Sequence, residues 1–177
     1  MNEKILLHAL LRRDLKSFIY KVFHTINPGM QFHNAWYIDH IAKHLEEIST
    51  KASQRLIINI PPRCLKSISI SVAWPAWLLG IAPNKRIIVA SYSQILSTKH
   101  SLDCRAVLQS HWYKEIFPGT IISQCQKNKF TTTEFGFRIA TSIGGSITGE
   151  GADILIVDDP HNPTYICLLY TSDAADE

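Results

Sequence analysis

The chain has 177 residues, of which 46% are hydrophobic and 19% charged, so it is neither disordered nor fibrous and is long enough for one ordinary domain. Its net charge of +3 is compatible with nucleic-acid binding and equally with an ordinary solvated surface. Four cysteines without a C-x-x-C pair indicate neither a zinc site nor a disulfide framework. Because no signal-peptide core or membrane-spanning apolar run is present, we expect a cytoplasmic protein with no membrane contact.

The N-terminal part of the chain is expected to be a helical segment. Apolar residues recur near helical spacing over residues 3–24 and again over 34–48, with a proline and a glycine between them. His40 and His44 lie four apart on the second helix, but no carboxylate stands between them, which favours a surface position over a metal site.

Two aromatic residues just upstream of the central segment, Phe32 and Trp36, admit two interpretations. ATPases often stack an adenine on residues that precede their phosphate loop, and Trp36 is the candidate for that role here. Apolar packing at the edge of a sheet explains both side chains equally well.

Residues 55–67 are the most informative stretch. An apolar run ends at two prolines, and Lys66 and Ser67 then open a helical segment. In a phosphate-binding loop of this layout the backbone N–H groups face the phosphates, the lysine reaches the outer phosphates and the hydroxyl binds Mg²⁺. The strict motif G-x-x-x-x-G-K-[ST] is not met, since Ile60 and Leu65 occupy its glycine positions. A buried strand and turn with a solvated Lys66 is the alternative.

The following segments alternate between apolar helices and short apolar strands. This alternation predicts a doubly wound α/β sheet, in which ligands sit at the carboxyl ends of the strands. An interior proline, Pro75, should kink or shorten the first helix. The expected elements are a helix at 66–80, a strand at 86–90, a helix at 95–110 and an antiparallel pair at 129–133 and 136–141, followed by a glycine-rich loop at 142–151.

A second motif closes the pattern at residues 154–159, where four apolar residues run into Asp158 and Asp159. This is the layout of a Walker B element, in which one carboxylate holds Mg²⁺ and the next orients or deprotonates the attacking water. A buried strand with a solvated acidic turn is the alternative, but the pairing with the upstream loop favours the nucleotide interpretation.

Several blocks beyond these two motifs occur in one order along the chain. Together they resemble the ATPase half of the large terminase subunit of tailed phages and prophages, the motor that packages DNA into capsids. The blocks are Trp36-Tyr37-Ile38-Asp39, the run from Arg55 to Arg63, Trp74-Pro75-Ala76-Trp77, Ala90-Ser91-Tyr92-Ser93-Gln94, and Thr148-Gly149-Glu150-Gly151-Ala152-Asp153 through to Asp158-Asp159-Pro160-His161.

The resemblance implies a P-loop NTPase of the ASCE type, with a mainly parallel sheet flanked by helices and preceded by an N-terminal helical segment. It implies a helical segment at 1–50 and an incomplete ATPase core at 51–163. Residues 164–177 do not look like the family, so we expect a truncation or unrelated sequence there. The family's nuclease domain has no counterpart in the chain.

The resemblance also implies site residues for ATP and Mg²⁺. Lys66 would contact the β- and γ-phosphates, Ser67 and Asp158 would ligate the metal, Asp159 would act on the attacking water, and Arg63 would stabilise the γ-phosphate or form only a surface ion pair. The nucleotide-binding set is Pro62, Arg63, Cys64, Leu65, Lys66, Ser67 and Trp36, with Cys64-Leu65 standing where many relatives have His-Gly.

The function implied is ATP hydrolysis that moves double-stranded DNA into a procapsid, independently of DNA sequence. The partners implied are a terminase small subunit, a portal protein and further copies of the chain in a ring. Two alternatives stay open: a helicase-like ATPase, and a nucleotide-binding fragment without catalysis.

Overall fold

A computed structural model describes residues 3–50, 54–145 and 149–162 of the chain. Its helices are α1 (Glu3–Arg13), α2 (Leu15–Ile26), α3 (Trp36–Thr50), α4 (Trp74–Ile81), α5 (Gln94–Gln109) and α6 (His111–Ile116), with a π-helical segment, η1 (Ile68–Ala73), directly before α4. The strands are β1 (Arg86–Ser91), β2 (Ile122–Cys125), β3 (Lys129–Thr132), β4 (Phe137–Ser142) and β5 (Ile154–Asp158). The predicted tail at 164–177 lies outside the described residues.

The strands form one mixed sheet in the order β2-β3-β4-β1-β5. Strand β1 is parallel to β4 on one side and to β5 on the other, whereas β2–β3 and β3–β4 are antiparallel. The predicted mainly parallel sheet of a P-loop NTPase is therefore wrong. The described chain forms a mixed α/β sheet in which half of the pairings are antiparallel.

Connection length explains the mixed pairing. Strands joined by a tight turn can only be antiparallel, whereas a parallel neighbour needs a long crossover. The β3–β4 turn spans only residues 133–136, and the β2–β3 turn is as short, so both joints are hairpins. Between β1 and β4 the chain passes through α5, which lets those two strands run parallel. The predicted antiparallel pair around Glu134 and Gly136 is confirmed.

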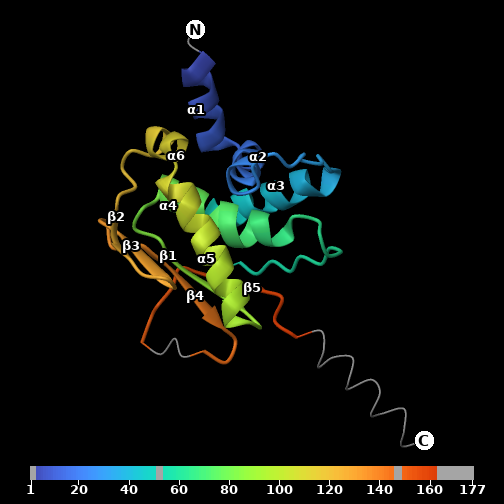
Figure 1. Cartoon of the computed structure of the whole chain (residues 1–177), viewed down its shortest axis with the longest axis vertical. Helices are drawn as coiled ribbons and strands as arrows, with labels where there is room; N and C mark the ends of the chain where they lie inside the picture. The colour runs from blue at the N-terminus through green and yellow to red at the C-terminus, as the bar shows by residue number, and fades with distance from the viewer. Residues whose placement is uncertain (1–2, 51–53, 146–148, 163–177) are drawn as a thin grey trace, which may run out of the picture.

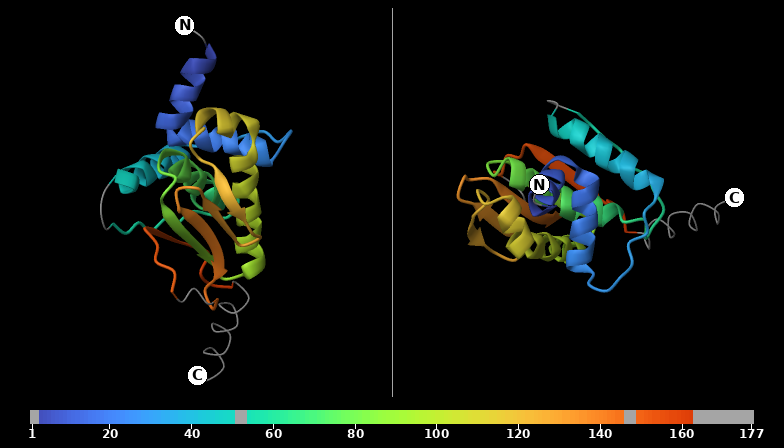
Figure 2. Two further views of the ribbon diagram at one scale, coloured as in Figure 1. Left: turned by 90° about the vertical axis from the view of Figure 1, so that its left-hand side faces the viewer. Right: turned by 90° about the horizontal axis from the view of Figure 1, so that it is seen from above.

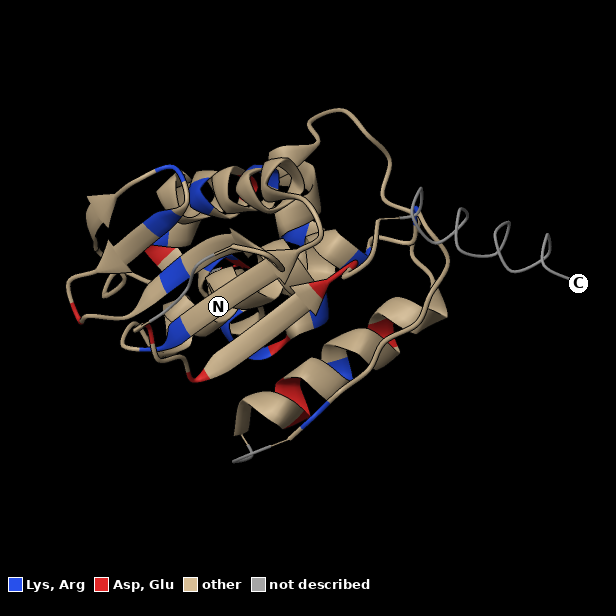
Figure 3. Ribbon diagram, turned by 90° about the horizontal axis from the view of Figure 1, so that it is seen from below, with Lys and Arg blue, Asp and Glu red and all other residues tan. Residues whose placement is uncertain are grey.

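The apolar stretch at residues 55–60, expected as a strand, does not join the sheet. It is extended and runs alongside α3 (Figure 3). Ile58 and Ile60 pack against the core, whereas Ile57 is 85% exposed. Half-buried and exposed residues alternate only over residues 57–60, and within the described residues no neighbouring strand pairs with this stretch.

Helix α5 lies across one face of the sheet and packs on β4 and β1. Helix α1 projects from the top of the molecule in the view of Figure 1. The N-terminal helices and the sheet share one hydrophobic core, and the view from the side shows them gathered above and beside the strands (Figure 2). The helix expected over residues 3–24 is two helices, because Asp14 caps α2 by accepting a hydrogen bond from the Ser17 amide.

Candidate functional site

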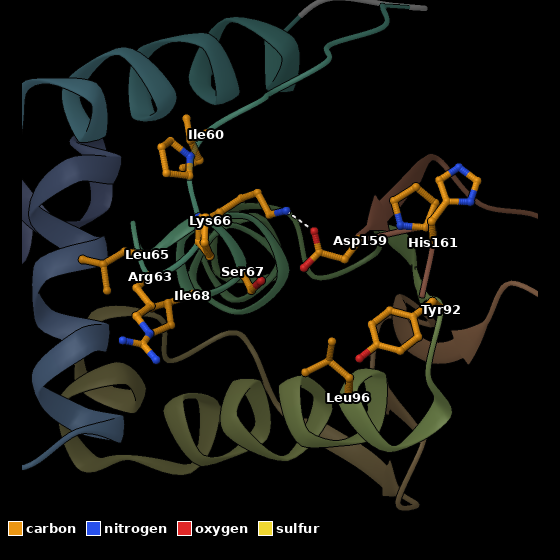
Figure 4. Close-up of a pocket in the computed structure, with 13 residues that line it drawn as sticks. Ile60, Arg63, Leu65, Lys66, Ser67, Ile68, Tyr92, Leu96, Asp159 and His161 are labelled. Atoms are coloured by element: carbon orange, nitrogen blue, oxygen red, sulfur yellow. Dashed lines mark hydrogen bonds and ion pairs between the residues drawn. The ribbon is translucent and has the colours of Figure 1, made fainter. Parts of the chain in front are cut away.

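The two sequence motifs meet at one edge of the sheet. Strands β1 and β5 are parallel, with Ser91 opposite Asp158, so their carboxyl ends open on the same side. The loop at residues 61–67 lies at this edge, where it brings Lys66 to the end of β5 (Figure 4). Lys66 therefore lies at the carboxyl ends of two parallel strands, as expected, even though the rest of the sheet is mixed.

Lys66 donates a short hydrogen bond to Oδ1 of Asp159, which lies 93 residues away in sequence, and its Nζ is 3.5 Å from Oδ1 of Asp158. Partial burial works to lower the pKa of Lys66, but the hydrogen bond to Asp159 and the charge of Asp158 outweigh it, and the pKa is raised. The ammonium group thus stays charged at neutral pH. Its single positive charge offsets part of the negative charge of the two carboxylates, which the sequence interpretation assigned to the metal and to the attacking water.

The two carboxylates differ in environment. Asp158 is 3% exposed and its Oδ2 accepts a hydrogen bond of 2.8 Å from the hydroxyl of Ser71. Asp159 has a side chain that is 48% exposed and points into the pocket. Its carbonyl accepts from the amide of Tyr92, which holds this residue at the end of β1. The buried carboxylate is therefore fixed, whereas the exposed one, paired with Lys66, is accessible to a ligand in the pocket.

Backbone strain gathers at this site. Among the described residues, four that are not glycine have a positive φ, and three of them line the pocket: Arg63 (65°), Leu65 (59°) and Asp159 (48°). Left-handed backbone is costly for residues with a side chain and tends to gather at functional sites. Leu65 occupies a motif position where glycine would adopt this conformation freely.

The pocket has a volume of about 670 Å³, within the range of small-molecule sites. Of the predicted residues, Pro62, Arg63, Leu65, Lys66, Ser67 and Asp159 line it, and Asp158 lies beneath Lys66. Sequence reasoning missed three further lining residues, Tyr92, Leu96 and His161. Tyr92 and His161 lie on the same side of the pocket as Asp159, across from the loop that carries Lys66 (Figure 4). The position of Tyr92 directly after a predicted parallel strand was the signal that would have found it.

Three of the predicted nucleotide-binding residues do not have the positions that their predicted roles require. Trp36 is 75% exposed, packs edge-on against His40 and does not line the pocket. Cys64 also does not line it; its thiol lies beside Tyr37 and raises the pKa of that phenol. Arg63 does line the pocket, but its guanidinium points away from the Lys66–Asp159 pair (Figure 4).

Behind Asp158 lies a buried polar cluster that the sequence did not indicate. Nδ1 of His100 is 3.8 Å from Oδ2 of Asp158, and burial lowers the pKa of His100, as does the nearby charge of Arg138. Arg138, on β4, is fully buried and donates from Nη2 to the carbonyl of Ser71 at 3.0 Å. A charged residue within the apolar strand Phe137–Ser142 was the available signal.

The residues present fit a magnesium nucleotide. Mg²⁺ prefers one or two protein oxygens completed by water and phosphate. Within the described ranges, no group of three or more His, Cys, Asp or Glu side chains is placed to hold a metal. Asp158 and Ser67 are the residues that would hold Mg²⁺ if a nucleotide supplied the remaining oxygens. The pocket is lined by a cation, Lys66, a carboxylate, Asp159, and a hydroxyl, Ser67, and the buried carboxylate of Asp158 lies 3.5 Å from Lys66, which suits that ligand.

No helix in the described part of the chain combines the length and the apolar character needed to cross a membrane. No protein-family model matches this chain, and no curated protein matches it either.

Proposed function

We propose that this chain binds ATP with Mg²⁺ in the pocket at the carboxyl ends of β1 and β5 and hydrolyses it. The observation that carries the proposal is the contact of Lys66 with Asp158 and Asp159, which joins the phosphate-binding and metal-binding motifs. The proposal rests on this local chemistry rather than on the class of the sheet, because one chemistry recurs on unrelated folds.

The residues divide the work of an in-line attack of water on the γ-phosphate. Lys66 would leave the carboxylates and offset negative charge on the phosphate oxygens, and Asp158 with Ser67 would hold Mg²⁺, which would supply further positive charge there. Asp159 orients the water and accepts the proton that it loses. The new bond joins the water oxygen to the γ-phosphorus, the bond to the β–γ bridging oxygen breaks, and ADP and phosphate leave.

The same proposal assigns the chain to the ATPase part of a large terminase subunit. That part would pull double-stranded DNA into a procapsid in the cytoplasm of an infected cell, as a ring with a small subunit and a portal. Its support is the set of sequence blocks in one order. Basic and acidic residues are interspersed over the elements seen from below (Figure 3). Contact with DNA would therefore be local, made to phosphates and weakened by salt.

Replacing Lys66 tests the proposal. Lys66→Ala should reduce hydrolysis of ATP by about 100-fold or more, because it removes the cation that meets the developing phosphate charge. The measurement is release of phosphate in single-turnover conditions with the whole chain in excess over ATP. Lys99→Ala is the matched control, since Lys99 makes a surface ion pair with Asp103 and does not line the pocket. Equal hydrolysis by Lys66→Ala and wild type would overturn the proposal.

One observation favours a second candidate function, nucleotide binding without turnover. The side chain of Leu65 stands in the loop where a glycine would let the backbone wrap the phosphates closely, and it packs against the core. Binding of ATP with no release of phosphate, in wild type as in Asp159→Asn, would select this second function.

A further inference from the structure

We infer that Ser71 and Arg138 are positioning residues that hold Asp158 with one carboxylate oxygen facing Lys66 and the other bonded in the protein interior. The inference rests on the proposed function, in which Asp158 holds Mg²⁺. Neither residue lines the pocket. Both act on the metal site only through Asp158.

The contacts of Asp158 divide its two oxygens. Oδ1 lies on the side of Lys66, 3.5 Å from Nζ, and is the oxygen that a metal at the pocket would meet. Oδ2 accepts a hydrogen bond of 2.8 Å from the Ser71 hydroxyl. A hydrogen bond to a buried carboxylate is stronger than one between neutral groups, so this contact fixes the rotation of the carboxylate.

Arg138 fixes Ser71 in turn. Its Nη2 donates to the carbonyl of Ser71 at 3.0 Å, while Nε and Nη1 have no hydrogen-bond partner within the described residues. A guanidinium that is 0% exposed is costly to bury, and such groups are usually paired. Here it joins β4 to η1 at the residue that contacts Asp158. An apolar residue would fill this buried position of β4 equally well, as apolar residues do elsewhere in the sheet.

The π-helical turn supports the same reading. Segment η1 begins directly after Ser67, and π-helical turns occur frequently at functional sites. Ser69 and Ser71 both lie in η1 and both are 0% exposed. Only the hydroxyl of Ser71 bonds to a carboxylate; that of Ser69 has no partner among the described residues. The two serines therefore differ in their contact rather than in their burial.

The test compares these two serines in the full chain. Magnesium is titrated against a fixed concentration of a fluorescent ATP analogue, and the half-saturating Mg²⁺ concentration is read from the fluorescence. Ser71→Ala should raise that concentration about tenfold, since the carboxylate loses one charged hydrogen bond. Ser69→Ala should leave it unchanged. Binding of the analogue in the presence of EDTA should be equal in both variants.

Variants of matched shape separate positioning from stability. Ser71→Thr keeps the hydroxyl and should bind Mg²⁺ better than Ser71→Val, which has nearly the same volume without it. This pair decides the question if Ser71→Ala does not fold. Arg138→Lys should retain more Mg²⁺ affinity than Arg138→Met.

The outcomes distinguish this inference from the proposed function. If the wild-type chain binds no magnesium nucleotide, both are overturned. If the wild type binds it and the Ser71 variants show the Mg²⁺ dependence of Ser69→Ala, or if Thr and Val at position 71 behave alike, only the positioning role is overturned.

Discussion

Leu65 adopts a backbone conformation that its own side chain opposes. At φ = 59° a leucine is strained, and the loop keeps this geometry because Lys66 and Ser67 follow at once and must face the pocket. The residue was recognised in the sequence as a departure from the glycine of the motif. Although leucine stands in place of the glycine of the motif, its backbone has the left-handed φ that glycine adopts without strain.

Leu65→Gly should therefore bind nucleotide more tightly, by about tenfold, because a bare backbone approaches phosphate more closely. Titration with a fluorescent ATP analogue in excess Mg²⁺ measures the dissociation constant. Leu65→Ala is the control, since it shortens the side chain but keeps the Cβ. If alanine improves binding as much as glycine does, the bulk of the leucine rather than its Cβ is what limits the loop.

The β3–β4 hairpin is the element most tightly joined to the rest of the sheet. Its turn packs onto the loop before β1: Thr132 donates its hydroxyl to the carbonyl of Pro83, and the amide of Phe137 donates to that of Lys85. Gly136 lies at the point of closest approach. A Cβ there would stand 2.0 Å from the Pro83 carbonyl oxygen, a backbone atom that cannot move aside.

Gly136→Ala should destabilise the protein by about 2 kcal/mol or more, since relieving the overlap must displace backbone on both sides. In a chain of this size, that lowers Tm by about 4–8 °C in a thermal melt followed by circular dichroism. Gly119→Ala is the matched control, because a Cβ at Gly119 would meet nothing within 4 Å. An unchanged Tm for Gly136→Ala would contradict this account of the turn.

Short-range sequence patterns correctly predicted the elements whose structure depends on residues close together in the chain. The hairpin around Gly136 followed from a turn between two short β-branched runs, and the core face of α3 followed from its helical spacing. The prediction of a strand at residues 55–60 was wrong, because strand pairing depends on a neighbouring strand that no local sequence pattern specifies. Motif order predicted that Lys66 and Asp159 lie at one site, but not that they form an ion pair. The buried Ser71 and Arg138 were not predicted, since only the folded chain brings Ser71 to Asp158 and Arg138 to Ser71.

At the scale of the whole molecule, β5 is one of the two edge strands of the sheet. Within the described residues it pairs with β1 alone. Ile156 and Asp158 are buried, whereas Leu155 and Val157 are 62% and 50% exposed. An apolar strand at an unpaired edge is a site for association with other chains.

We therefore expect concentration-dependent self-association that Leu155→Lys weakens, because a charge on an edge strand opposes edge-to-edge pairing. Sedimentation velocity over a range of protein concentrations measures the effect. Ile95→Lys is the control, since Ile95 is 85% exposed on α5, away from that edge. Equal suppression by both substitutions would point to general charge repulsion in place of edge pairing.

The contact of Lys66 with both carboxylates also affects the order in which a nucleotide and Mg²⁺ can bind in the pocket. With Lys66 in place, the ammonium group stands where a divalent ion would otherwise meet Asp158 and Asp159, so free Mg²⁺ has to compete with a tethered cation. Under the proposed function, a triphosphate would draw the lysine toward its own oxygens and so expose the two carboxylates to the ion. Binding would then be ordered, with the metal arriving together with the nucleotide or after it, and the empty protein would hold no metal ion tightly.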